Sequence, residues 1–147
     1  MRGINVFIKN TKSPAFLAVK RSPTDKVFPN MWSLPGGEYE PGETPEQAAK
    51  RESKEEIGVK IELKDSKPCL ITEVNLGEIR LVVEVYRAEL AENQTPRPVD
   101  GDIAEVKWIS PIPFIDSLTE HNYPGVEIER LKRFLVQEGF PLTLPAL

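Results

Sequence analysis

Three glutamates in the middle of the chain, Glu52, Glu55 and Glu56, have a spacing that could bring their carboxylates together. On a helix, positions i, i+3 and i+4 share one face. Like charges at i and i+4 repel each other by roughly 0.2–0.5 kcal/mol, so a cation should offset them. Oxygen ligands of this kind suit Mg²⁺ or Mn²⁺. The alternative is a solvated helix face on which Arg51 pairs with Glu55.

The residues around these glutamates predict the helix that would present them. Thr44 is typical of an N-cap, Pro45 of the first helical position, and Gln47 completes a capping box. Gly58 can adopt the left-handed conformation that ends a helix. We therefore expect a helix over residues 45–57.

A glycine pair, Gly36 and Gly37, lies a short distance upstream of the predicted helix. Adjacent glycines occur where a backbone bends sharply or approaches a ligand closely. The sequence therefore places a tight backbone turn next to the acidic helix.

Together, the turn and the helix resemble the signature of the Nudix hydrolase family, Gly-x5-Glu-x7-Arg-Glu-U-x-Glu-Glu-x-Gly-U, where U is an apolar aliphatic residue. The signature spans residues 37–59, and Ser53 is its one departure, at a position where the family prefers an apolar residue. Weaker similarity to MutT-type members continues through residues 32–36, the segment 105–108 and a basic C-terminal helix. The matching positions are Gly37, Glu43, Arg51, Glu52, Glu55, Glu56, Gly58 and Val59.

The resemblance implies that Glu52, Glu55 and Glu56 bind Mg²⁺ or Mn²⁺, with the Gly36 carbonyl as an additional ligand. Family members differ in which carboxylate acts as the general base. We assign that role provisionally to Glu52, with Glu55 as the competing candidate.

Other residues receive supporting roles from the same resemblance. Arg51 and Glu43 are expected to form an orienting pair that holds the loop against the helix. The resemblance also implies that Gly37 is one of the substrate-binding residues. In MutT-type members a further acidic ligand comes from the loop before the last strand, where Asp102 is the candidate; its alternative role is that of a turn residue.

Two residues are candidates for contact with substrate. Arg21 could bind phosphate through its planar guanidinium, although a solvated arginine is the alternative. Asn122 occupies roughly the place where MutT-type enzymes use an asparagine to read a purine edge.

The composition limits the other possibilities. The chain has 147 residues, 19 Lys plus Arg and 23 Asp plus Glu, giving a net charge of −4. This balance argues against binding a nucleic-acid polymer and favours a small phosphorylated substrate. Cys69 is the only cysteine, which excludes an intramolecular disulfide. We find no signal peptide and no apolar run long enough for a membrane span, and expect one cytoplasmic domain over residues 1–147 that does not bind membranes.

Hydrophobic patterning predicts more strands than helices. We expect a further helix over residues 126–137 and a short helix or turn around 115–118. The resemblance implies an α/β/α sandwich with a mixed sheet and helices on both faces. Strands are expected at residues 4–8, 15–19, 32–34, 38–40, 59–63, 69–74, 78–90 and 103–109.

The favoured function is cation-dependent hydrolysis of a nucleoside diphosphate linked to a group X. A normal, deoxy or oxidised nucleoside triphosphate, cleaved to monophosphate and pyrophosphate, is the favoured substrate. Hydrolysis of ADP-ribose or a nucleotide sugar is the alternative within this class. A non-catalytic nucleotide-binding module is the alternative from another class, and because dimers are frequent in the family, a homodimer stays open.

Overall fold

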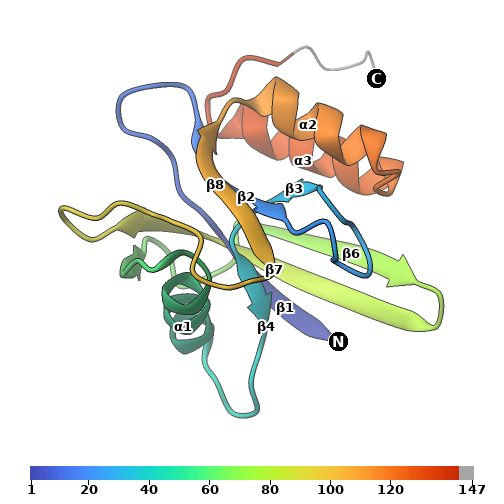
Figure 1. Cartoon of the computed structure of the whole chain (residues 1–147). Helices are drawn as coiled ribbons and strands as arrows, with labels where there is room; N and C mark the ends of the chain where they lie inside the picture. Colours follow the sequence, from blue (N-terminus) through green and yellow to red (C-terminus); the bar gives the residue numbers. More distant parts are fainter. Residues whose placement is uncertain (143–147) are drawn as a thin grey trace.

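The computed structural model describes residues 1–142, and its helices and strands follow the predicted order (Figure 1). α1 and β8 have the predicted bounds. α2 is longer than predicted because Pro111, which suits a first helical position, starts the helix directly after Ser110. The elements are β1 Arg2–Phe7, β2 Phe16–Arg21, β3 Trp32–Ser33, β4 Gly36–Glu38, α1 Pro45–Ile57, β5 Ile61–Leu63, β6 Leu70–Leu76, β7 Ile79–Leu90, β8 Ile103–Ile109, α2 Pro111–Glu120 and α3 Gly125–Gln137.

The strands form two sheets. The larger has the order β4-β1-β7-β5, with β6 also paired to β7, and the smaller has the order β3-β2-β8. β1 and β7 are parallel, whereas the other pairs are antiparallel. The sheet arrangement is therefore mixed, as predicted.

Side chains alternate along the central strands and so build two apolar cores. Val6 on β1 and Leu17 on β2 belong to the core that includes Ala48 of α1. Phe7 and Phe16, their neighbours in sequence, belong to the core that includes residues of α2 and α3. α1 thus covers one side of the strands, and α2 and α3 lie together on the other (Figure 1). This confirms the predicted α/β/α sandwich.

Local signals fix the ends of α1 as the sequence predicts. The Thr44 hydroxyl accepts from the Gln47 N–H at 3.2 Å, and the Thr44 N–H donates to Gln47 Oε1 at 3.0 Å. Gly58 ends the helix with φ 68°. Ser53, the departure from the family signature, is 1% exposed, and its hydroxyl has no hydrogen-bond partner within residues 1–142. It lies on the packed side of α1, away from the acidic face.

The segment after α3 is tied to the larger sheet by charged groups. The guanidinium of Arg87 on β7 donates from Nε and Nη2 to the two oxygens of Glu138, at 2.6 and 2.8 Å. Lys9 lies 3.7 Å from the same carboxylate.

In the part of the chain described, none of the helices has the length and apolar character needed to cross a membrane.

Candidate active site

The glutamate face of α1 lies against β4. The tight turn predicted at Gly36 and Gly37 is not observed, because both glycines are extended residues of β4 that pair with β1. The Gly36 N–H donates to Glu56 Oε1 at 3.1 Å. The Glu52 carboxylate lies so close to Gly37 that a Cβ atom there would come within 2.5 Å of it. The glycine pair of β4 and the acidic helix therefore form one site.

Strand pairing fixes the position of the glycine pair. Ile4 pairs with Gly37 and Asn5 with Gly36 across the β1–β4 ladder. A Cβ atom on Gly36 would collide with the Ile4 carbonyl and with Asn5. Glycine is thus required at position 36 by the backbone of β1, and at position 37 by Glu52.

Arg51 holds several parts of the site together. Its guanidinium donates to both oxygens of Glu43, at 2.7 and 2.8 Å, and to the Glu38 carbonyl at 2.9 Å. It also donates to Glu52 at 2.8 Å and to Glu55 at 3.2 Å. Hydrogen bonds from Arg51 lower the pKa of Glu43 to about 2, so Glu43 is a carboxylate at neutral pH. One arginine therefore joins the loop before α1 to two of the three glutamates on this face of the helix.

Burial and nearby charges shift the pKa values of two of the glutamates, Glu56 and Glu52. Burial, and then the negative charges of Glu52 and Asp100, raise the pKa of Glu56 to about 8, although the Gly36 N–H and Arg21 oppose this rise. Burial also raises the pKa of Glu52, against the effect of Arg51. The site thus holds negative charge that the protein compensates only in part.

The loop before β8 brings Asp100, a residue that sequence reasoning missed, to this site. The Val99 N–H donates to the Glu56 carbonyl and the Arg97 N–H to the Ile57 carbonyl, each at 3.1 Å. These bonds fasten the loop to the end of α1 and bring the charge of Asp100 close enough to act on Glu56. The sequence offers two aspartates, Asp100 and Asp102, on either side of Gly101. Their spacing from the last strand led the prediction to Asp102.

The three remaining predicted residues lie before β8, at the end of β2 and in the turn after α2. Asp102 forms a turn, in which its N–H donates to Asp100 Oδ1 and its carbonyl accepts from the Ser22 N–H. Arg21, at the end of β2, donates to Asp25 at 3.2 Å, and its charge acts on Glu56. Asn122 is exposed in the turn after α2, with φ 57°. The structure therefore brings the signature residues together through Arg51 and the Gly36 N–H, and leaves Asn122 at the surface.

The donor set fits a hard divalent cation. Glu52, Glu55 and Glu56 offer only carboxylate oxygens, and Asp100 adds a fourth carboxylate nearby. Across residues 1–142, however, no three acidic, histidine or cysteine side chains are already drawn into metal-ligating geometry. Glu52 and Glu55 instead share the guanidinium of Arg51. A cation would compensate the charge that raises the pKa of Glu56.

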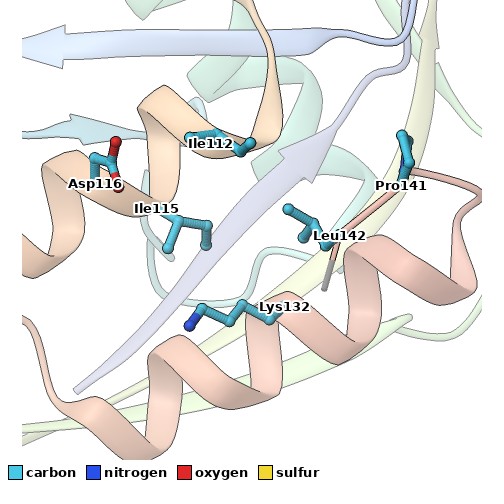
Figure 2. Close-up of a pocket in the computed structure, with 6 residues that line it drawn as sticks. All are labelled: Ile112, Ile115, Asp116, Lys132, Pro141 and Leu142. Carbon is cyan, nitrogen blue, oxygen red and sulfur yellow. The ribbon is translucent and has the colours of Figure 1, made fainter. Parts of the chain in front are cut away.

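A separate hollow lies on the opposite side of the strands, between α2, α3 and the segment that follows α3 (Figure 2). Its lining is mainly aliphatic, with Asp116 and Lys132 as charged side chains. It includes none of the candidate site residues. The lining residues are Ile112, Ile115, Asp116, Lys132, Pro141 and Leu142.

The fold, and an acidic helix packed against a glycine pair, are those of a Nudix domain. The family model described as NUDIX domain matches residues 1–127 of the chain. The chain therefore belongs to the NUDIX domain family, which confirms the resemblance seen in the sequence.

Solved structures share this fold. A MutT protein from Methanosarcina mazei Go1 is 21% identical, has a TM-score of 0.73 and is covered over 95% of each chain. A NUDIX hydrolase from Nitrosomonas europaea is 18% identical, with a TM-score of 0.73 and coverage of 99% of this chain and 95% of that one. At these identities the likeness establishes the fold alone.

Curated relatives are similar over shorter segments. A Nudix hydrolase from Deinococcus radiodurans is 30% identical over 112 residues, which make up 76% of this chain and 64% of that protein. A nucleoside triphosphatase, NudI, from Enterobacter sp. (strain 638) is 46% identical over 54 residues, 37% of this chain and 38% of that protein. The chain thus matches less than two thirds of the length of either relative.

Proposed function

We propose that the chain is a divalent-cation-dependent hydrolase of a phosphoanhydride bond in a nucleoside diphosphate linked to a group X. The observation that carries the proposal is the contact of the Glu52 and Glu56 carboxylates with the glycine pair Gly36–Gly37 of β4. The charge of Arg21 also acts on Glu56. Phosphoanhydride hydrolysis needs this combination, because phosphate oxygens repel an attacking nucleophile until their charge is neutralised.

The favoured substrate is a nucleoside triphosphate, which includes deoxy and oxidised forms. Water forms a new bond to one phosphorus of the α,β bridge, and the bond from that phosphorus to the bridging oxygen breaks. The products are a nucleoside monophosphate, pyrophosphate and a released proton. The similarity to a nucleoside triphosphatase from Enterobacter supports this choice.

Each side chain has a role that follows from its position. Glu52, Glu55 and Glu56 would hold Mg²⁺ or Mn²⁺, together with the Gly36 carbonyl and an aspartate of the Asp100–Asp102 turn. A cation bound there would neutralise phosphate charge and lower the pKa of a coordinated water. Glu52, which lies against Gly37 and accepts from Arg51, would take the proton from the attacking water, with Glu55 as the alternative base.

Arg51 and Glu43 would support the reaction indirectly, by positioning other residues of the site. Their paired hydrogen bonds fix the loop before α1, and Arg51 also orients Glu52. Arg21, at the open end of β2, would bind substrate phosphate through the part of its guanidinium that Asp25 leaves free.

The test is hydrolysis with Mg²⁺ or Mn²⁺ by the wild type and by Glu52→Gln. The substrates are nucleoside triphosphates, 8-oxo-dGTP, ADP-ribose and nucleotide sugars. We expect metal-dependent release of pyrophosphate from triphosphates and a drop in kcat of about 10²–10⁴-fold in Glu52→Gln, the size typical of a lost general base. Glu46→Gln is the matched control, because Glu46 is on the same helix and pairs with Lys50 outside the site.

Two results would overturn the proposal. Equal rates for the wild type and Glu52→Gln would show that the glutamate site does not take part in catalysis. Binding of nucleotides without metal-dependent turnover would instead indicate a non-catalytic module. Turnover of ADP-ribose or a nucleotide sugar in place of triphosphates would keep the reaction class and change the group X.

A further inference from the structure

Asp25, in the loop between β2 and β3, is a largely buried carboxylate to which the proposed reaction assigns no role. Its side chain is 15% exposed. Oδ1 accepts from the N–H groups of Val27 and Phe28, each at 3.0 Å. Oδ2 accepts from Arg21 Nη1 at 3.2 Å. The two oxygens therefore have different tasks, because one folds the loop and the other pairs with an arginine.

The backbone of Arg21 is fixed, but its side chain depends on Asp25. The Arg21 N–H donates to the Met31 carbonyl at 3.0 Å. The pairing of β2 with β8 shifts register between Lys20 and Arg21, an irregularity that often re-aims a side chain next to an active site. The side chain itself is 41% exposed, and among residues 1–142 Asp25 is the only hydrogen-bond partner of its guanidinium. Asp25 thus determines where the guanidinium lies.

Hydrogen bonds attach the end of β2 and the end of α1 to one short stretch of the loop before β8. The Ser22 N–H, next to Arg21, donates to the Asp102 carbonyl at 2.9 Å. The Val99 N–H donates to the Glu56 carbonyl at 3.1 Å. Val99 and Asp102 are three positions apart in the chain. This shared attachment brings the Arg21 end of β2 to the acidic helix, in agreement with the effect of the Arg21 charge on the pKa of Glu56.

We propose that Asp25 is a positioning residue, which holds the Arg21 guanidinium in the orientation that binds substrate phosphate beside the α1 glutamates. The inference rests on the proposed function for its reaction and substrate class. A long arginine side chain loses conformational freedom when it binds a ligand. An ion pair that orders it beforehand removes part of this cost and presents the remaining N–H groups of the guanidinium to phosphate.

The variant Asp25→Asn separates the two tasks of the carboxylate. Its amide oxygen can still accept from Val27 and Phe28, whereas its NH₂ group cannot accept from Arg21. Asparagine also suits turns of this kind as well as aspartate does. We expect a melting temperature near that of the wild type, because an ion pair with an exposed arginine contributes little to stability.

Steady-state kinetics with Mg²⁺ test the proposal, with the nucleotide that the wild type hydrolyses fastest. We expect Asp25→Asn to raise KM about tenfold and to change kcat by less than about threefold, because the oriented guanidinium contributes to binding before the chemical step. Asp65→Asn is the matched control. Asp65 Oδ2 also accepts from an arginine Nη1, that of Arg87, at 3.2 Å, but outside the candidate site. This control should behave as the wild type.

A double-mutant cycle with Arg21→Ala identifies the residue through which Asp25 acts. Arg21→Ala alone should raise KM at least as much as Asp25→Asn does. In the Arg21→Ala background, Asp25→Asn should add less than about twofold, because the two side chains act as one unit. The inference is overturned if the effects of the two changes multiply in full, since Asp25 would then act through the loop. An unchanged KM in Asp25→Asn would overturn it as well.

Binding of the α,β-methylene analogues of GTP and ATP with Mg²⁺, measured by calorimetry, separates this inference from the proposed function. If the wild type binds an analogue but hydrolyses no nucleotide, the proposed function fails. The dissociation constants of the wild type and the cycle variants then decide the role of Asp25, with the same pattern expected as for KM. A wild type that neither binds an analogue nor hydrolyses a nucleotide overturns both.

Discussion

At the scale of single residues, Gly36 and Gly37 are neighbours, but a side chain at each would meet a different obstacle. At Gly36 the obstacle is backbone, the Ile4 carbonyl, which cannot move without breaking the β1–β4 ladder. At Gly37 it is only the carboxylate of Glu52, the far end of a flexible side chain. One glycine is therefore a requirement of the fold, and the other is a requirement of the site.

This difference predicts opposite outcomes for two alanine variants. Gly37→Ala should fold with a melting temperature near that of the wild type, because Glu52 can turn aside, but should lose about 10²-fold or more in kcat. Gly36→Ala should be strongly destabilised. Thermal melting and steady-state kinetics on both variants check this. Full activity in Gly37→Ala would show that the position of Glu52 against Gly37 is not needed.

At the scale of elements, the end of α3 is fastened to β7 by one carboxylate. Glu138 is 7% exposed at its side chain and accepts two hydrogen bonds from Arg87, which lower its pKa below the ordinary value. Because the unfolded chain then binds the proton more readily than the folded chain, this contribution to stability is complete above the ordinary carboxyl pKa, about 4.3, and is lost as the pH falls through the lower, folded value.

We therefore expect Glu138→Gln to lose about 1–3 kcal/mol of unfolding free energy at pH 7, as is typical of a charged hydrogen-bonded pair. The difference from the wild type should shrink as the pH is lowered below about 4.3. Urea unfolding between pH 7 and pH 3 measures it. Glu78→Gln, in the exposed turn after β6, is the control. A difference independent of pH would show that the ionised form of Glu138 is not what stabilises the structure.

At the scale of the whole molecule, the two apolar cores share their strands. Along β1 and β2 successive side chains enter opposite cores, as Val6 and Phe7 do. Neither core can lose its packing while the shared strands stay ordered around the other. This coupling is the physical reason to expect one cooperative unit, in line with the prediction of a single domain.

The two tryptophans can test this coupling, because Trp32 packs against the core of α2 and α3, and Trp108 against that of α1. Fluorescence unfolding curves of Trp32→Phe and Trp108→Phe should each coincide with the far-UV circular dichroism curve of the same variant. Separate midpoints for fluorescence and circular dichroism within either variant would indicate that the cores unfold independently.

The sequence by itself determined the local features of this protein. The bounds of α1 follow from its own capping box and Gly58, and the i, i+3, i+4 spacing places three glutamates on one face whatever packs nearby. The periodic strands and the family signature were also readable, because these signals lie within short stretches of chain. Mixed sheets and helices on both faces came from the resemblance, since periodicity alone selects no topology.

Only the tertiary structure decided which distant residues meet. The loop before β8 binds the end of α1, and the charge of Asp100 in that loop contributes to the raised pKa of Glu56. Likewise, no local pattern indicates that Glu127, on a helix rich in charged residues, is buried, and only the packing of α3 shows it. Burial and long-range contact depend on how elements pack, and no local pattern in the chain encodes them.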